Sequence, residues 1–380
     1  MPRTLMKGNE VIGAAAIRAG CRAFFGYPIT PQTELPEYMA AHLPPVGGVF
    51  VQAESEIAAI NMVYGASGSG ARVMTSSSSP GIALKQEGIS YIAGAELPCV
   101  IVNVMRGGPG LGGIQPSQSD YFQATRGGGN GDYRLLVYAP ANLQELADLV
   151  QIAFDKADYY RNPVLILADG MLGQMMEPVE FRDDLPRMEL PAKDFAATGT
   201  MGERAPRVIN SLYLKPEELE AHIHRLFAKY EAMKVNEPLV ETVGLEGAEI
   251  VVVAYGTTAR IVRSAMATLA EEGIHIGLIR PITLFPYPMG VFETLPESVR
   301  QLLVVEMSMG QMIDDVRIAN EGRLPISFVG RTGGMVPTPA LVAERVRELL
   351  GATAVGGASE GSGATAYQGV GTGSTTGGAR

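Results

Sequence analysis

The chain has 380 residues, of which 46% are hydrophobic and only 18% are charged, and it contains 46 glycines and 25 prolines. This length and composition are typical of an α/β protein with two domains, and they exclude a disordered chain or a coiled coil. The formal net charge of -10 argues against a nucleic-acid binder, because neutralising phosphates requires a basic surface.

The first 180 residues alternate helical and strand patterns, which predicts a doubly wound α/β domain with a mostly parallel sheet. The predicted helices are residues 8–20, 56–68, 81–93 and 143–160, and the predicted strands are residues 22–28, 71–76, 98–105 and 163–169. Residues 98–105, PCVIVNVM, form a continuous apolar run. Such a run is typical of a strand that is buried on both faces of a parallel sheet.

Three further regions follow residues 1–180. Residues 181–245 are polar and proline-containing, and we interpret them as a connector with one helix at 215–234, which Pro216 opens. Residues 246–350 are predicted to form a second α/β domain, with strands at 249–256, 274–280 and 302–307, helices at 259–272 and 339–350, and a proline-rich turn at 281–288. Residues 351–380 are rich in glycine, serine and threonine, which predicts a flexible tail.

Cysteine usage and the N-terminus indicate a reduced, cytoplasmic setting. Cys21 and Cys99 lie far apart without a CxxC motif or a histidine cluster, so this chain alone can build neither a zinc nor an iron–sulfur site. The first 20 residues lack the features of a signal peptide, and no segment reaches about 18 uninterrupted apolar residues. We therefore expect no metal site and no membrane insertion.

Two sequence features look functional but have simpler explanations. Residues 108–113, GPGLGG, satisfy the GxGxxG pattern, yet the residues that follow predict a long loop rather than the helix of a dinucleotide fold. A phosphate-binding GxxxxGK[ST] motif is also absent. His222 and His224 are one residue apart on the predicted helix 215–234, so they point to different sides, and we expect them to be solvated rather than metal-bound.

Polar residues also stand at the ends of predicted strands and helices. The serine run 76–79 lacks a GxSxG context and a partner histidine, so it is expected to offer hydroxyls and amides to a ligand at the carboxyl end of a strand. Glu54 and Glu56 stand where helix 56–68 begins. On composition alone, the favourable interaction of acidic residues with the helix dipole explains them better than catalysis does.

Five motifs in order along the chain resemble one family. They are GYPITPQTELPEYM at 26–39, ESEIAA at 54–59, SSPG at 78–81, RGGPGLGGIQPSQSD at 106–120 and VVAYGTTARI at 252–261. Together they resemble the α subunit of 2-oxoacid:ferredoxin oxidoreductases, and most closely its 3-methyl-2-oxobutanoate (ketoisovalerate) branch. The resemblance covers residues 1 to about 350, and it implies a thiamine diphosphate pyrimidine-binding domain followed by a domain like the C-terminal domain of transketolases.

The resemblance implies a cofactor-binding role for several residues. Glu56 would hydrogen-bond the aminopyrimidine ring of the cofactor, so that the exocyclic nitrogen of the ring can remove the C2 proton. Glu54 is the second choice for this role. The other residues expected to line the cofactor pocket are Tyr27, Ile29, Ser78 and Ser79.

The resemblance also implies substrate contacts. Thr30 would lie beside the carboxylate or keto group of a 2-oxoacid. Arg106 would pair with that carboxylate, since the planar guanidinium can form two parallel hydrogen bonds with it.

Some parts of a complete thiamine enzyme are missing from this sequence. Residues 168–170, ADG, lack the continuation of a GDG motif that holds magnesium and the diphosphate. In the family, those groups and the iron–sulfur clusters belong to separate subunits. We therefore expect a β subunit that carries the GDG motif and an iron–sulfur cluster, together with γ and ferredoxin-like subunits and ferredoxin itself.

The predicted function is oxidative decarboxylation of a 2-oxoacid with coenzyme A, which yields an acyl-CoA, carbon dioxide and two electrons for ferredoxin. A substrate such as 2-oxoglutarate or an aryl 2-oxoacid stays open, because the branches share most of their motifs. The sequence is also compatible with half of a thiamine enzyme that transfers no electrons, and with a structural subunit that has kept the fold but not the catalysis.

Overall fold

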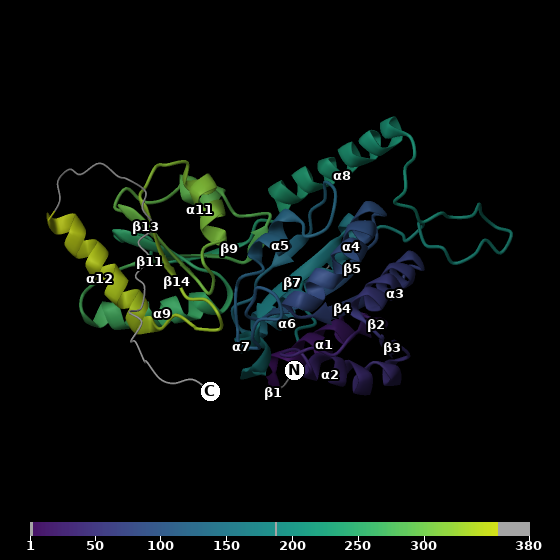
Figure 1. The fold of residues 1–380 in the computed structure, drawn as a ribbon, viewed down its shortest axis with the longest axis horizontal. Helices are drawn as coiled ribbons and strands as arrows, with labels where there is room; N and C mark the ends of the chain where they lie inside the picture. The colour runs from purple at the N-terminus through teal and green to yellow at the C-terminus, as the bar shows by residue number, and fades with distance from the viewer. Residues whose placement is uncertain (1–2, 187, 356–380) are drawn as a thin grey trace, which may run out of the picture.

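The computed structural model describes residues 3–186 and 188–355. Two α/β units, each a sheet with its helices, lie side by side in it. A long helix, α8 (Pro216–Asn236), crosses the outside of the molecule (Figure 1). Residues of the segment before α8 extend away from the body as an irregular arm.

The larger sheet has seven strands in the order β12-β6-β7-β5-β4-β2-β3. Its strands are β2 (Ala23–Gly26), β3 (Val49–Gln52), β4 (Val73–Ser77), β5 (Cys99–Met105), β6 (Leu136–Tyr138), β7 (Pro163–Asp169) and β12 (Thr283–Phe285). All neighbouring strands pair in parallel except β12, which is antiparallel to β6 at the edge. This arrangement confirms the predicted α/β fold with a mostly parallel sheet.

Helices cover both faces of this sheet because successive strand residues point to opposite faces. The helices are α1 (Gly8–Arg18), α2 (Glu34–His42), α3 (Glu56–Gly68), α4 (Ser79–Gly94), α5 (Tyr121–Arg126), α6 (Leu143–Tyr160) and α7 (Gly170–Gln174). On β5, Val100, Val102 and Val104 pack in one core with α1, α2 and α6. Cys99, Ile101 and Met105 pack in the other with α3, α4 and α5. The predicted two-sided burial of this strand is confirmed.

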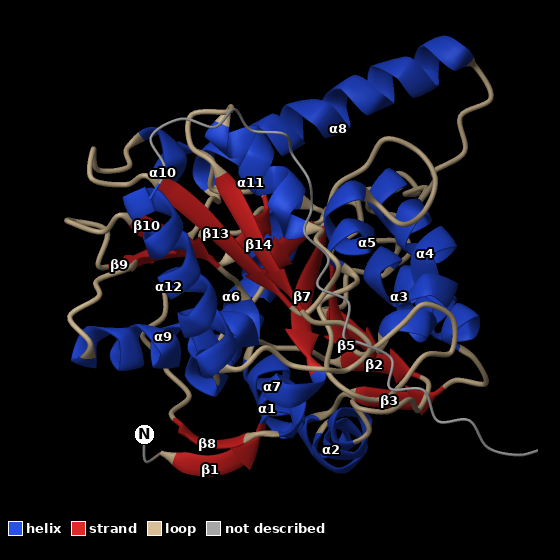
Figure 2. Cartoon of the chain, turned by 60° about the vertical axis from the view of Figure 1, so that its left-hand side comes forward, coloured by secondary structure: helices blue, strands red, loops and turns tan. Residues whose placement is uncertain are grey.

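The second sheet has five strands in the order β14-β13-β10-β11-β9, of which β9 is antiparallel to its neighbour. The strands are β9 (Val240–Val243), β10 (Ile250–Val253), β11 (Gly277–Pro281), β13 (Gln301–Glu306) and β14 (Ile326–Gly330), and the helices are α9 (Gly256–Glu271), α10 (Gly290–Glu293), α11 (Met312–Asn320) and α12 (Pro339–Val355). Helices α9 and α12 cover one face of this sheet (Figure 2). The other face of this sheet shares a hydrophobic core with the larger sheet, and this common core holds the two α/β units together.

Short elements complete the chain, and some of them correct the predictions. A two-stranded antiparallel pair joins β1 (Thr4–Lys7) to β8 (Met176–Val179), and a short 3-10 helix spans Pro44–Val46. The predicted turn at 281–288 is wrong in part, because it contains β12, which extends the larger sheet. The connector is also not free of strands, since β9 lies within it. Both strands depend on distant partners, which local sequence patterns do not reveal.

The boundary of the predicted tail also changes. Helix α12 continues to Val355, so the first residues of the predicted tail are helical. Residues 356–380 lie outside the described residues. Within the described part of the chain, no helix combines the length and the apolar character needed to span a membrane.

The prediction that His222 is solvated is wrong. Its side chain is buried against the first domain, where its Nε2 lies 2.7 Å from the main-chain oxygen of Gly94, and its ring stacks on Tyr213. Helix α8 is therefore packed through this residue onto the end of α4, which the sequence of α8 alone could not indicate. Among the described residues, no group of three or more His, Cys, Asp or Glu is placed to hold a metal ion.

Candidate active site

The predicted site residues gather at one edge of the larger sheet. Thr30 follows β2, Glu56 follows β3, Ser78 follows β4 and Arg106 follows β5, and these four strands are adjacent and parallel. Their carboxyl ends therefore meet at the same edge, which is where open α/β sheets bind ligands. Segments that are up to 76 residues apart are thus brought to one place, as the bond between Arg106 and Thr30 illustrates.

Glu56 is the first residue of α3 and is 6% exposed, whereas Glu54 is exposed. The side chain of Ser55 caps the helix by accepting a hydrogen bond from the Ala58 N–H at 3.1 Å. Because the cap satisfies this orphan donor, the carboxylate of Glu56 is not needed to do so. The burial of Glu56 and the exposure of Glu54 support the choice of Glu56 as the functional carboxylate.

Gly81, in the first turn of α4, lets the Glu56 carboxylate approach the backbone closely. A Cβ atom at this position would lie 2.6 Å from Glu56 Oε1 and 2.0 Å from Ser77 Oγ. Neither distance is tolerable for a carbon atom, so any side chain here would displace the carboxylate, the serine or the helix.

If the cofactor is the thiamine diphosphate that the family resemblance implies, we expect Gly81→Ala to weaken its binding, because the added methyl group moves Glu56 Oε1 or Ser77 Oγ. The control is Gly65→Ala on α3, where nothing lies within 4 Å of the new Cβ. That control should raise the stability by about 0.4–1 kcal/mol, since alanine restricts the unfolded chain. Calorimetric titration and thermal unfolding measure the two effects; equal cofactor binding by both variants would contradict this assignment.

The serines after β4 divide into two kinds. The hydroxyls of Ser77 and Ser78 are buried, and within the described residues neither has a hydrogen-bond partner. Ser79 is internally bonded instead, since its Oγ donates to Asp120 Oδ2 at 2.5 Å and accepts from the Arg106 N–H at 3.0 Å. Because buried polar atoms are rarely unsatisfied, these two hydroxyls have hydrogen-bonding capacity that the described residues leave unused.

Arg106 links the loops around the site. Its side chain is 7% exposed, and its Nη1 and Nη2 donate to the main-chain oxygens of Thr30 and Leu111 at 2.9 and 3.1 Å. Nε is buried without a partner among the described residues. The guanidinium thus lies beside Thr30, as the predicted substrate role requires, but two of its nitrogens hold main-chain groups.

Sequence reasoning missed two polar residues that support this site. Asn103, on the buried strand β5, accepts from the Ser79 N–H at 3.1 Å and donates to Asp120 Oδ2 at 2.9 Å. Burial raises the pKa of the Asp120 carboxyl, although the hydrogen bonds from Ser79 and Asn103 act in the opposite direction. A polar residue inside an apolar strand was the available signal for Asn103, because such a residue needs a partner.

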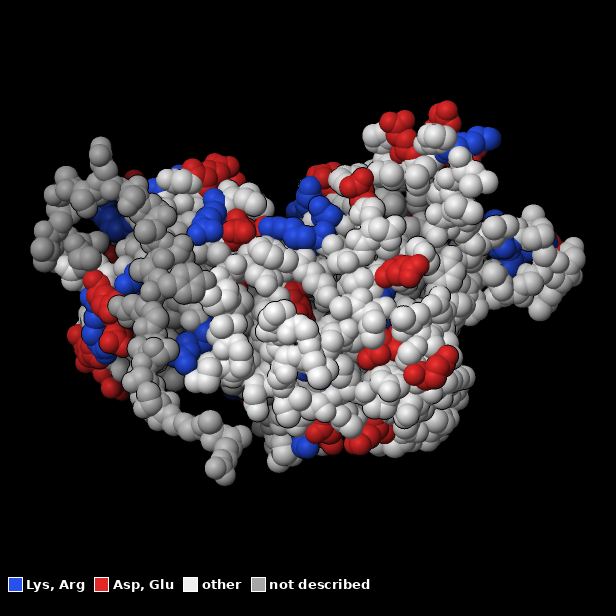
Figure 3. Space-filling view, viewed as in Figure 1, with Lys and Arg blue, Asp and Glu red and all other residues white. Residues whose placement is uncertain are grey.

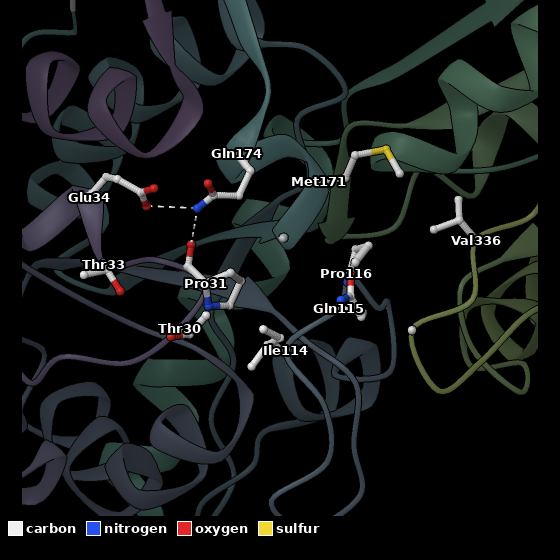
Figure 4. A pocket seen from close by; sticks show the side chains of 12 residues that line it. Thr30, Pro31, Thr33, Glu34, Ile114, Gln115, Pro116, Met171, Gln174 and Val336 are labelled. Carbon is white, nitrogen blue, oxygen red and sulfur yellow. Dashed lines mark hydrogen bonds between the residues drawn. The ribbon is translucent and has the colours of Figure 1, made fainter.

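A cavity of about 600 Å³ opens beside Thr30 (Figure 4). Its lining is mainly apolar and comes from both α/β units of the molecule, with Ile114, Met171 and Val336 among the apolar side chains. At its polar end, Gln174 Nε2 donates to the main-chain oxygen of Pro31 and to Glu34 Oε2, both at 2.9 Å. Of the predicted site residues, Thr30 lines this cavity, and the others are not part of its lining: Glu56, Ser78, Ser79 and Arg106 are buried, Tyr27 is exposed and Ile29 is half-buried.

One face of the molecule carries charges of both signs on a largely uncharged surface (Figure 3). On the face in Figure 3, Lys and Arg side chains are interspersed with Asp and Glu. The cavity itself contains Glu34, whose pKa burial would raise, but hydrogen bonds from its own main-chain N–H and from Asn9 and Gln174 lower it overall. Glu34 is therefore an ionised group at the polar end of the cavity, where Lys7 pairs with it at 3.1 Å.

Comparisons with known proteins agree along most of the chain. Residues 14–238 match the family model described as pyruvate flavodoxin/ferredoxin oxidoreductase, thiamine diphosphate-binding, and residues 248–342 match core domain II of pyruvate:ferredoxin oxidoreductase. The ketoisovalerate oxidoreductase subunit VorB of Methanothermobacter thermautotrophicus is 48% identical over 92% of this chain and 99% of its own length. The 2-oxoglutarate synthase subunit KorA of Methanocaldococcus jannaschii is 36% identical over 91% of this chain and 99% of its own length.

A similar solved structure also comes from a 2-oxoacid:ferredoxin oxidoreductase. The 2-oxoglutarate:ferredoxin oxidoreductase from Magnetococcus marinus, with 2-oxoglutarate, coenzyme A and succinyl-CoA bound, is 29% identical, with a TM-score of 0.83. The match covers 91% of this chain but only 65% of that chain, so the present chain spans about two thirds of it. A split-gene transketolase, an inactive β4 tetramer, has a TM-score of 0.54 at 14% identity over 91% of this chain and 98% of its own. That likeness shows a shared fold alone.

Proposed function

The chain belongs to the family of 2-oxoacid:ferredoxin oxidoreductase subunits, and from this premise we propose that it supplies the pyrimidine half of a thiamine diphosphate site. The observation that carries the proposal is the buried carboxylate of Glu56 near the unpaired hydroxyl of Ser77, with the unpaired hydroxyl of Ser78 next along the chain. A carboxylate acceptor and two free hydroxyls fit an aminopyrimidine ring, which offers both donors and acceptors.

Bound thiamine diphosphate would supply a nucleophilic carbon and an electron sink for decarboxylation. Glu56 would hold the pyrimidine ring through a hydrogen bond to a ring nitrogen, in a site where burial strengthens that bond. Gly81 leaves the space that this carboxylate needs. Thr30, in the loop after β2, and Nε of Arg106, which has no partner among the described residues, would orient the 2-oxoacid.

The overall reaction converts a 2-oxoacid, coenzyme A and two oxidised ferredoxins into an acyl-CoA, carbon dioxide, two reduced ferredoxins and one proton. The described residues hold no cluster of candidate metal ligands, and the sequence lacks a GDG motif. A β subunit therefore supplies the magnesium and diphosphate site and an iron–sulfur cluster, and γ and ferredoxin-like subunits complete the path to ferredoxin. The complex works in the cytoplasm.

The preferred substrate is a branched-chain 2-oxoacid of the ketoisovalerate type. The mainly apolar cavity beside Thr30 suits an aliphatic side chain better than the second carboxylate of 2-oxoglutarate, because burying an unpaired carboxylate against an apolar lining is unfavourable. The two VorB subunits named for ketoisovalerate, at 48% identity, are more similar to this chain than the KorA subunits named for 2-oxoglutarate, at 35–39%, although a ketoisovalerate subunit named VorA is only 27% identical. A panel of 2-oxoacids assayed on the assembled complex tests the choice; a higher kcat/KM for 2-oxoglutarate would reverse it.

We expect Arg106→Lys to raise the KM for the 2-oxoacid and to spare thiamine diphosphate binding. Lysine keeps the charge but cannot bond Thr30 and Leu111 through a planar fork while presenting a further N–H to the substrate. Steady-state kinetics with the 2-oxoacid and with coenzyme A varied in turn separate the effects. A change in the KM for coenzyme A alone would exclude Arg106 from the substrate carboxylate.

A further inference from the structure

A lysine lies completely buried beneath the candidate site, and none of the roles above uses it. Lys85, on α4, is 0% exposed, and its Nζ donates to Thr75 Oγ1 at 2.6 Å and lies 3.3 Å from the main-chain oxygen of Ser76. Thr75 Oγ1 in turn donates to the main-chain oxygen of Phe25 at 2.6 Å. The ammonium group thus ties α4 to the ends of β4 and β2, the strands that lead to the serines and to Thr30.

The position of Lys85 relative to Glu56 follows from the helix. Lys85 lies four residues after Gly81, so the two residues share one face of α4 a single turn apart. Gly81 in turn touches the Glu56 carboxylate. Glu56, from α3, is the charge that acts on Lys85, while β4 presents the neutral groups of Thr75 and Ser76. The pKa of Lys85 is lowered to about 7, because the effect of burial exceeds the opposite effect of the Glu56 charge.

Two lysines elsewhere in the described chain that expose little surface are held differently. Lys229 on α8, whose side chain is 11% exposed, forms an ion pair with Glu96 at 3.2 Å, and Lys156 forms one with Glu237 at 2.7 Å. Lys85 has no ion pair within 4.0 Å among the described residues, although removing a cation from water without a close counter-ion is strongly unfavourable. The interaction of Lys85 with the Glu56 carboxylate offers a reason for burying this lysine without a close ion pair.

We propose that Lys85 is a positioning residue for the pyrimidine-binding part of the cofactor site. Its amino group hydrogen-bonds the end of β4, and its charge interacts favourably with the carboxylate of Glu56. The inference rests on the proposed function, since the benefit of this charge is felt where Glu56 meets the pyrimidine ring. It assigns Lys85 no contact with substrate or cofactor. Its influence passes through Glu56 and through the serines of β4.

The test compares Lys85→Met with Lys229→Met in the complex co-expressed with its GDG-bearing partner. Methionine keeps an unbranched apolar stem, and Lys229→Met controls for the loss of a buried cation away from the site. We expect Lys85→Met to lower the rate of C2 proton exchange in thiamine diphosphate by roughly 10–100-fold, the size seen for residues that orient a ligating group. The Kd for the cofactor should change far less, because the diphosphate contacts belong to the partner. Equal exchange rates in the two variants would overturn the proposal.

A second measurement needs neither cofactor nor partner. In the chain labelled with carbon-13 at lysine Cε, we expect the Lys85 resonance to titrate below the usual lysine range, because its ammonium group is completely buried. Glu56→Gln should lower its titration midpoint, because the charge that raises the pKa of Lys85 is removed. An unchanged midpoint would overturn the coupling, whether or not Lys85→Met assembles.

The two measurements separate this inference from the function on which it rests. A shifted midpoint together with normal exchange in Lys85→Met would refute the positioning role and leave the cofactor site intact. Normal exchange in Glu56→Gln would refute the cofactor site itself.

Discussion

Replacing Glu56 by Gln should lower the rate of C2 proton exchange in bound thiamine diphosphate by roughly 10²–10⁴, the range for loss of a positioned proton-transfer group. Glutamine has nearly the same shape, so the packing against Gly81 and the capped start of α3 should persist. The loss is therefore chemical rather than structural. Proton–deuterium exchange at C2, followed by NMR in the assembled complex, measures it directly.

The matched change is Glu54→Gln, which removes an exposed carboxylate two residues earlier. We expect it to have a much smaller effect, because an exposed group is solvated and does not face the buried serines. A large loss in Glu54→Gln with normal exchange in Glu56→Gln would transfer the role to Glu54. Unaltered turnover in both variants would favour a structural subunit instead.

The second large effect concerns the chain in isolation, which should bind thiamine diphosphate weakly or not at all. Charged contacts with Mg²⁺ and phosphate usually dominate the affinity for a diphosphate ligand, and the described residues offer no cluster of metal ligands. The isolated chain should also be colourless, because Cys21 and Cys99 are buried apart as free thiols and cannot ligate an iron–sulfur cluster.

Co-expression with a GDG-bearing, cysteine-rich partner should make tight cofactor binding, brown colour and 2-oxoacid-dependent dye reduction appear together. Calorimetric titration of the chain alone, with magnesium present, is the decisive measurement. Micromolar or tighter binding by the lone chain would refute the half-site and require a diphosphate site within this chain.

The sequence by itself determined the local elements and the location of the candidate carboxylate. Residues 56–68, 143–160 and 163–169 form the predicted elements with the predicted bounds, because local signals mark them: Ser55 and Asn142 cap the two helices, and a continuous apolar run forms the strand. Thr30 and Glu56 were selected through the resemblance of the motifs at 26–39 and 54–59 to the family, since composition alone favoured a helix-dipole role for Glu54 and Glu56.

Only the tertiary structure decided which distant residues meet. The pairing of β12 with β6, the burial of His222 against Gly94 and the bond from Arg106 to Thr30 all join segments far apart in sequence. Local sequence periodicity does not predict such contacts, because they depend on how the sheets and helices pack against one another.

Lys85 illustrates the difference between the two levels most clearly. In the sequence it is an ordinary cation on a predicted helix, where the default expectation is a solvated side chain. The fold places it at 0% exposure beneath Glu56, with its ammonium on Thr75. The sequence thus determined the carboxylate, while the packing of α4 between α3 and β4 decided which charge lies beside it, because burial and electrostatic coupling are set by the neighbours that folding brings together.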